Sequence, residues 1–394
     1  MGEGLCPRQK SADSRLSRIA EDKRVWRRKE KHKMDVLRDS LPASARWRPP
    51  TSHDYLTVAG QWGAHGHGRT FGILVAAMCA AVAMGAASGG EATRALPEGN
   101  SGIAERYPGD VGIAKDTRVV FVEDFEAGSV ADLNKSWENV TNREILSLSR
   151  DIPAGSAGRQ SLLMTHVGGK STGAHLYRRL QPGYGQLHLR FYVKFDPKCA
   201  PIHHFVHMGG YNPPTPWPQG EAGERPGGHE RFTTGVEPYG NAWRWDFYSY
   251  WMEMRSSPGE KFWGNDFIND NKLAAARGKW VCVELMMKMN DPVTERNGEQ
   301  AIWIDGQLWR KEGQVISHLG KGFPKGKWVW DSFLPDPKGE PFEGFRWRKD
   351  ENLNLNFLWL LLYMTKAPDG HESKVWFDHI VVAKEYIGPL TPLR

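Results

Sequence analysis

Long stretches of this chain alternate between apolar and polar residues, the pattern of a β-strand with one buried face. In residues 186–195 (QLHLRFYVKF) an apolar side chain falls at every second position from Leu187. The positions between them hold His188, Arg190, Tyr192 and Lys194. The pattern predicts a strand with one face in the core and a basic, aromatic face opposite.

A second run repeats this design. Residues 243–251 (WRWDFYSYW) place Trp and Phe on one side. Arg244, Asp246, Tyr248 and Tyr250 fall on the other side. Cationic and phenolic groups in rows across neighbouring strands would suit an extended, negatively charged sugar polymer. We therefore expect a polysaccharide partner, anionic in character.

Strand-like runs recur from residue 117 to residue 394, without a linker, a repeat or a long helical period. Seventeen Trp, 43 Gly and 25 Pro also describe a turn-rich β protein. We predict an all-β, two-sheet antiparallel sandwich over residues 117–394. Residues 211–230 are dense in Pro and Gly and predict a long loop. Asp305 and Gly306 predict a hairpin turn between two apolar strands.

The formal net charge of +6 is concentrated near the N-terminus. Residues 1–68 form a basic leader that we expect to be disordered, or to be an over-extension of the reading frame. Since the excess charge lies in this leader, it does not indicate a nucleic-acid partner.

Residues 69–87 (RTFGILVAAMCAAVAMGAA) have the layout of a secretory signal: a positive start, an apolar run and small residues at the end. The alternative is a signal anchor, although the run is short for a bilayer span. We expect cleavage, a secreted or periplasmic protein without a stable membrane span, and a flexible linker over residues 88–116.

The exported part would retain Cys199 and Cys282. An oxidising compartment permits a disulfide between them, and two buried thiols are the equal alternative. Their spacing matches no zinc motif, so we expect no metal ligands among them.

Three segments carry a resemblance to a known superfamily. They are FVEDFEAG at residues 121–128, GKWVCVELMMKMN with AIWIDGQLW at 278–309, and VWFDHIVVAKEYIGPL at 375–390. Their order resembles the concanavalin A-like jelly roll of bacterial polysaccharide lyases and lectin-like domains. The resemblance implies that the first strand pairs with the last. It also implies that the W-x-x-x-E and D-G-x-x-W motifs lie on adjacent strands.

The resemblance also suggests chemistry. The glucanase branch would carry an E-x-D-x-x-E motif, which this chain lacks, so retaining glycoside hydrolysis is not expected. A lyase instead needs a group that neutralises the uronate carboxylate, a base and an acid. In PIHHFVHMGG, alternation places His203 and His207 on one face, where histidine suits the base. The alternative is that both histidines bind loop backbone.

Tyr248 and Tyr250 share a face with Arg244, which makes this trio the leading catalytic candidate. Tyrosines with a hydrogen-bonded hydroxyl are also common in sandwich cores. We predict that Arg190, Tyr192 and Lys194 extend the same concave face as sugar subsites, unless Lys194 simply faces solvent. The loop residue Trp217 would close over a sugar ring or anchor its loop.

No cofactor is expected to be required. The resemblance implies a structural calcium near Asp124, Glu126 and Asp378. The leading interpretation is a polysaccharide lyase that works by β-elimination. A non-catalytic carbohydrate-binding module or lectin uses the same features, and a surface protein whose basic strands meet a partner is a third alternative.

Overall fold

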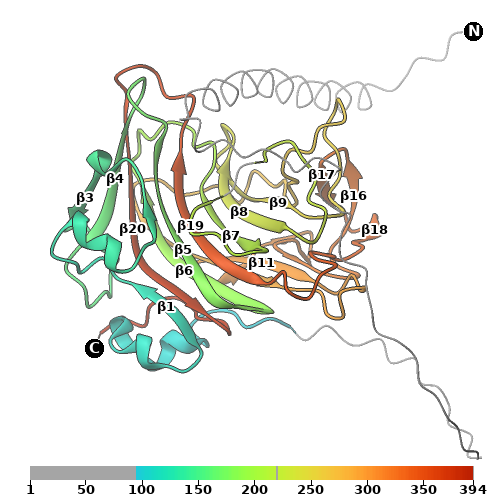
Figure 1. The fold of residues 1–394 in the computed structure, drawn as a ribbon, viewed down its shortest axis with the longest axis horizontal. Coiled ribbons are helices and arrows are strands. Elements are labelled where there is room, and N and C mark those ends of the chain that lie inside the picture. Colours follow the sequence, from blue (N-terminus) through green and yellow to red (C-terminus); the bar gives the residue numbers. More distant parts are fainter. Residues whose placement is uncertain (1–94, 219–220, 394) are drawn as a thin grey trace, which may run out of the picture. The chain divides into compact units, whose positions relative to one another are not determined.

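Two antiparallel β-sheets face each other in the computed structural model, which describes residues 95–218 and 221–393 (Figure 1). The unit that carries them spans Leu96–Arg394. The predicted leader and signal lie outside the described residues. The predicted all-β, two-sheet antiparallel sandwich is confirmed.

The first sheet has nine strands in the described part of the chain, with the order β12-β11-β10-β6-β20-β4-β3. Strand β1 also pairs with β20, and β15 with β11. The bounds are β1 (Val119–Glu123), β3 (Leu146–Ser149), β4 (Ser161–Val167), β6 (Gln186–Phe195), β10 (Trp280–Lys288), β11 (Glu299–Ile304), β12 (Gln307–Leu308), β15 (His318–Leu319) and β20 (Glu372–Ala383).

The second sheet has six described strands in the order β2-β5-β19-β7-β8-β9. They are β2 (Asn139–Val140), β5 (Gly173–Tyr184), β7 (Val206–Tyr211), β8 (Arg231–Tyr239), β9 (Arg244–Tyr250) and β19 (Leu355–Tyr363). Small sheets join β13 (Arg310–Lys311) to β14 (Gln314–Val315), and β16 (Lys325–Val329) to β17 (Ser332–Pro335) and β18 (Glu340–Pro341).

The core lies between the two sheets and takes the apolar positions that alternation predicts. On β6 the residues from Leu187 to Phe195 at every second position are fully buried in this core. On β9, Trp245 and Phe247 point inward in the same way. Burying a side chain of this size contributes about 1.5–3 kcal/mol, so the alternating pattern fixes which face of each strand turns inward.

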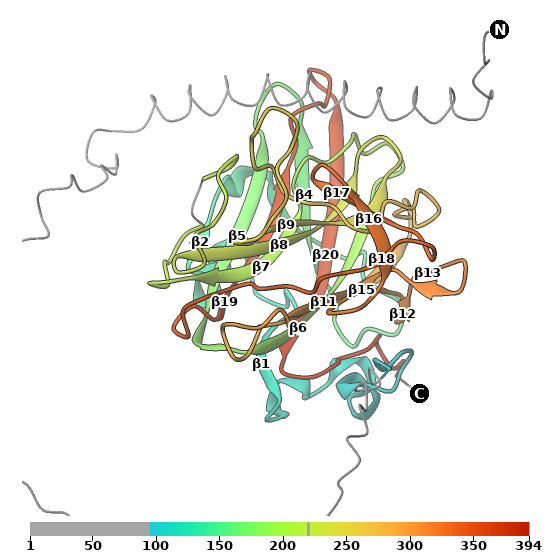
Figure 2. The ribbon, with the colours of Figure 1, turned by 90° about the vertical axis from the view of Figure 1, so that its right-hand side faces the viewer.

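The outer face of the nine-stranded sheet is covered by both ends of the described chain, which lie together in Figures 1 and 2. The short 3-10 helices Ile103–Arg106, Pro108–Asp110 and Ile113–Lys115 pack there, and Ile103 and Ile113 are buried with Ile387. The expectation of a flexible linker over residues 88–116 is therefore wrong for residues 96–116. The few apolar side chains of this segment pack against apolar residues near the C-terminal end of the described chain.

The pairing of the first strand with the last, which the resemblance implied, is present. The W-x-x-x-E motif lies on β10, whereas the D-G-x-x-W motif begins in the turn after β11 and continues into β12, which pairs with β11 and not with β10. Strand β1 pairs antiparallel with β20, and β10 pairs antiparallel with β11. The turn at Asp305 and Gly306 joins β11 to β12, and both residues have positive φ. Of the two alternatives for the cysteines, the structure contains buried free thiols at Cys199 and Cys282.

Within the described residues, no helix has the length and apolar character needed to cross a bilayer.

Candidate functional site

One row of side chains crosses the outer face of the six-stranded sheet. Strand register pairs Tyr177 with Trp359, Trp359 with His207, His207 with Gly235, and Gly235 with Tyr248. The residues next to them along each strand point into the core, so by alternation these side chains point away from it. The row therefore brings aromatic and imidazole groups from five strands to one face of the sheet.

A histidine and carboxylate cluster lies in the middle of this row. His204 Nδ1 is 2.9 Å from Glu237 Oε1, and His207 Nε2 is 3.8 Å from the same oxygen. His207 Nδ1 lies 3.0 Å from the Phe205 carbonyl oxygen, so it carries the proton that is donated there. The His204 ring stacks on Tyr363 and lies 4.8 Å from the Tyr248 ring.

Burial controls the protonation of this cluster. His207 is 5% exposed and Glu237 is 3% exposed. Burial lowers the pKa of His207 to about 3, and the nearby His204 adds to this effect. Burial also raises the pKa of Glu237, although His204 opposes the shift. His207 is therefore neutral at physiological pH, with Nε2 as an acceptor.

Tyr248 and Tyr250 form a hydroxyl pair next to the cluster, with their oxygens 3.2 Å apart. The backbone of Gly264 lies against the Tyr248 ring, where an added Cβ would come within 2.6 Å. Burial raises the pKa of Tyr248 well above its usual value, and Tyr250 raises it further. Burial also raises the pKa of Tyr250, while Tyr248 and Arg231 act in the opposite direction. The Arg231 guanidinium lies 5.6 Å from the Tyr250 ring centre.

The Pro-rich loop between β7 and β8 reaches the same face. The Tyr177 hydroxyl donates to the Thr215 carbonyl at 3.1 Å, and the Arg231 side chain bonds Glu221. Trp217, two residues after Thr215, has 56% of its surface exposed. The Trp217 backbone carbonyl accepts a hydrogen bond from the Thr215 hydroxyl, in the loop segment that Tyr177 contacts. The role of Trp217 as a sugar platform stays a prediction.

A polar cavity of about 770 Å³ lies near Tyr250, which follows two residues after Tyr248 at the end of the row. Gly223 bonds the Tyr250 side chain through its backbone, and Phe262 and Arg225 line the cavity. Arg225 lies over the Phe262 ring at 5.1 Å. Three ion pairs also line it: Arg255 with Glu343, Arg296 with Glu253, and Lys321 with Glu295. Arg225 adds one further positive charge to these balanced pairs.

The predicted subsites on β6 lie elsewhere. Arg190, Tyr192 and Lys194 belong to the nine-stranded sheet, so the expectation that they extend the face of Tyr248 is wrong. Arg190 is fully buried and paired with Asp110, and Tyr192 accepts a hydrogen bond from the Leu390 backbone. Lys194 pairs with Asp151. The chain ends cover this face, and its polar groups hold those ends in place.

The Arg244 guanidinium is also bound by other side chains of the protein. Its guanidinium bonds Asp246 at 2.9 Å and Asn269 at 2.8 Å, and it lies 3.5 Å from Asp266. It shares the face of Tyr248 and Tyr250, as alternation predicts, but its partners hold it at the start of β9. The arginine beside the tyrosine pair is instead Arg231.

The local geometry also separates the predicted histidines. Strand β7 begins at Val206, and His204 forms an isolated bridge to Tyr363, so strict alternation does not extend back to His203. His203 instead lies 3.2 Å from the Thr365 hydroxyl. The histidine that joins His207 is therefore His204.

Sequence reasoning missed Glu237 and Arg231 as well as His204. Both lie at alternate positions of β8, on the face of Gly235. Alternation within the run ERFTTGVEP could have placed them on one face, but only the register with β7 and β9 shows what they meet.

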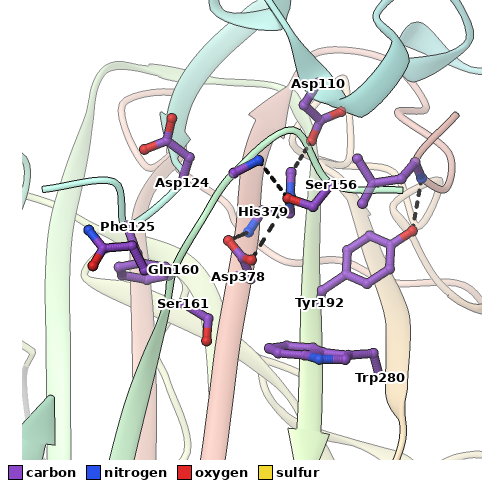
Figure 3. Close-up of polar contacts among 12 residues, drawn as sticks. Asp110, Asp124, Phe125, Ser156, Gln160, Ser161, Tyr192, Trp280, Asp378 and His379 are labelled. Carbon is purple, nitrogen blue, oxygen red and sulfur yellow. Dashed lines mark hydrogen bonds and ion pairs between the residues drawn. The ribbon is translucent and has the colours of Figure 1, made fainter. Parts of the chain in front are cut away.

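A second polar cluster lies on the outer side of the nine-stranded sheet, where Figure 3 shows His379 between Ser156 and Asp110. His379 Nε2 is 2.6 Å from the Ser156 hydroxyl, and Nδ1 is 2.8 Å from Asp110. Asp110 also pairs with Arg190. These contacts join the N-terminal segment to β20, which makes them structural links between the chain ends.

Asp378, next to His379, bears on the calcium that the resemblance implied. Its Oδ2 is buried without a hydrogen-bond partner in the described residues. Burial, with smaller contributions from Glu126 and Asp124, raises the pKa of Asp378 to about 8, although the hydrogen bond from the His379 backbone N–H acts in the opposite direction. An orphan buried carboxylate oxygen fits a cation ligand. Glu126 fits less well because its oxygens accept the backbone N–H groups of residues 159 and 160.

Comparisons with known proteins show similarity at the level of structure. No protein-family model matches the chain, and no curated protein matches it by sequence. The chain is similar to alginate lyase vAL-1 from Chlorella virus, with 13% identity, a TM-score of 0.45, and coverage of 68% of this chain and 100% of that one. It is also similar to the PL-14 alginate lyase from Aplysia kurodai, with 13% identity, a TM-score of 0.45, and coverage of 68% and 99%. Alginate lyase Aly36B gives 15% identity, a TM-score of 0.42, and coverage of 68% and 98%. Such low identities and TM-scores carry no information about activity.

Proposed function

We propose that this protein binds an acidic polysaccharide on the outer face of the six-stranded sheet and cleaves it by β-elimination. The observation that carries this proposal is the pair of hydroxyls of Tyr248 and Tyr250, 3.2 Å apart, with the Arg231 guanidinium at the Tyr250 ring. Imidazole groups lie on the other side of Tyr248. The two tyrosines therefore come from β9 and the cation from the adjacent strand β8.

The elimination would proceed with a balanced transfer of protons. The reaction starts with Tyr250 as its phenolate, the form that the hydrogen bond from Tyr248 and the Arg231 guanidinium favour against burial. The phenolate oxygen takes the proton at C5 of a uronate, the electron pair of that C–H bond forms a C4–C5 double bond, and the bond from C4 to the glycosidic oxygen breaks. Tyr248 donates its proton to the leaving oxygen. The hydrogen bond between the two hydroxyls then returns a proton from Tyr250 to Tyr248 and restores the site.

The surroundings suit a chain of anionic sugars. Arg225 adds positive charge to the cavity at one end of the row, and Trp217 offers an exposed ring at the other end. An aromatic ring packs on the apolar face of a pyranose, while the guanidinium bonds a carboxylate. These groups would hold sugars on either side of the tyrosine pair.

A second candidate function is polysaccharide binding without cleavage. Burial supports it, because Tyr248 is 8% exposed and Tyr250 is 5% exposed. A sugar that reaches Trp217 and the cavity without contacting the two hydroxyls would be bound and left intact. The outcome of a single cleavage assay separates the two functions.

We also propose that the protein is exported, on the basis of the signal-like run at residues 69–87. N-terminal sequencing of the mature protein from the secreting cell tests this. Export predicts a new N-terminus just after residue 87, and a mature chain that retains residues 69–87 would contradict it.

The cleavage assay uses the purified chain with alginate, polygalacturonate, polyglucuronate and hyaluronan, and follows the ultraviolet absorbance of unsaturated uronate. We expect absorbance to rise with at least one polymer, and Tyr248→Phe or Tyr250→Phe to lower the rate about 100-fold or more. Tyr184→Phe is the matched control, because that hydroxyl bonds the Gln181 carbonyl away from the site. No absorbance change, together with retention on a polymer column, would favour binding alone.

A further inference from the structure

The cluster of His204, His207 and Glu237 has the composition and spacing of a metal centre. Its three potential ligand atoms, one from each residue, all lie within 4.8 Å of one another. Glu237 Oε1 lies 2.9 Å from His204 Nδ1 and 3.8 Å from His207 Nε2. Ligands about 2.0–2.1 Å from one tetrahedral zinc ion lie about 3.3 Å apart, between these two values.

The orientation of His207 is that of a metal ligand. Its Nδ1–H is donated to the Phe205 carbonyl, which leaves Nε2 as an acceptor 3.8 Å from Glu237 Oε1. Two acceptors at 3.8 Å repel unless a proton or a metal cation lies between them. Metal-bound histidines commonly donate their second ring nitrogen to a backbone carbonyl in this manner.

We propose that His204 Nδ1, His207 Nε2 and Glu237 Oε1 bind one divalent transition-metal ion, of which zinc is the best match. Two imidazoles and one carboxylate favour zinc over calcium or magnesium, which prefer oxygen ligands. Binding needs small shifts of the two rings, and His204 has the freedom to make them because 23% of its side chain is exposed.

Three protein ligands leave one coordination position open, as in catalytic rather than structural zinc sites. His204 marks the exposed side, and the Tyr248 ring lies 4.8 Å from it. If the proposed function holds, the open position would take the carboxylate of the uronate whose proton is removed. The metal would then add to the neutralising charge of Arg231, since Arg244 is held by Asp246 and Asn269. Metal binding itself does not depend on the proposed function.

Isothermal titration of the chelator-treated full chain with zinc tests the site directly. We expect His204→Ala and Glu237→Gln each to remove one bound equivalent, or to weaken that equivalent at least about 100-fold, since even outer-shell changes cost 10–100-fold. Two variants are needed because Glu237→Gln alters a buried group, whereas His204 is partly exposed. His229→Ala, which removes a histidine with 60% side-chain exposure, is the matched control for surface binding.

Cobalt(II) provides a second measurement, because its visible spectrum reports coordination without any turnover. We expect tetrahedral or five-coordinate bands in the wild-type chain and in His229→Ala, and their loss in His204→Ala and Glu237→Gln. Equal zinc stoichiometry and affinity in all four proteins would overturn the metal site. Bound zinc without cleavage would overturn only the proposed function, and cleavage by a chain that binds no zinc would overturn only this inference.

Discussion

A single methyl group at Gly235 should disturb the site by displacing the His207 imidazole. Gly235 lies between His207 and Tyr248 in the cross-strand row. A Cβ at this position would lie 2.6 Å from His207 Nε2 and 3.0 Å from Cδ2 and Cε1. Ordinary contacts begin at 3.4 Å, so the imidazole has to move by roughly 0.8 Å.

The size of the effect follows from this overlap. His207 is only 5% exposed and is held by the Phe205 carbonyl, so the ring cannot swing freely into solvent. Forcing an extra methyl into such a packed position costs about 1–3 kcal/mol. The melting temperature of Gly235→Ala should fall by roughly 2–10 °C. Because the clash displaces His207 Nε2 from its present position 3.8 Å from Glu237, zinc affinity and cleavage should both decrease.

Circular dichroism melting and zinc calorimetry on the purified variant measure both effects. Gly185→Ala is the control, because a Cβ there meets no atom within 4 Å. We expect this control to stay within about 0.5 kcal/mol of wild type. A Gly235→Ala protein with the melting temperature and zinc affinity of wild type would refute the packing of His207 against Gly235.

Further predictions concern the nine-stranded sheet. Asp110→Asn should cost about 3–5 kcal/mol in chemical denaturation because it leaves Arg190 buried without its carboxylate, and a loss below 1 kcal/mol would contradict that role. Burial would raise the pKa of Glu299, but His318 and Lys288 hold it below its usual value. Its contribution to stability is thus present above about pH 4.3 and is lost as pH falls, and pH-dependent melting of Glu299→Gln should lack this part of the acid loss. Calcium at about 100 times its Kd should stabilise the chain by about 2.7 kcal/mol, and Asp378→Asn should abolish the shift; an equal shift in both proteins would exclude Asp378 as a ligand.

The fold was accessible from the sequence because the side-chain period of a strand is a local property. The alternation in residues 186–195 and 243–251 named the inward residues of β6 and β9 correctly. Alternation cannot say which sheet a strand joins. The two runs look alike, yet β6 and β9 belong to different sheets.

The outer face of β6 also shows why polar character alone does not identify a site. Arg190 looked like a ligand for an anionic sugar, but its partner is Asp110, which is 80 residues earlier in the chain. That contact depends on the packing of the N-terminal segment, which carries no strong sequence pattern. Burial of a charged residue is therefore visible only in the folded chain.

The histidine cluster could not be predicted by alternation, because the chain is irregular just before β7 begins. Alternation through PIHHFVH pairs His203 with His207, while the bridge of His204 to Tyr363 places His204 beside Glu237 instead. Tyr248 and Tyr250 needed no such correction, because β9 is regular across both residues.

The most direct test of β-elimination by this protein is the chemical structure of the products formed from a uronate polymer. Mass spectrometry distinguishes elimination from hydrolysis, because each eliminated chain end is lighter by one water molecule and carries a C4–C5 double bond. We predict unsaturated ends from the wild-type chain, and their near absence with Tyr248→Phe. Hydrolysed ends, or intact polymer after incubation with every uronate polymer of the panel, would contradict β-elimination by this protein.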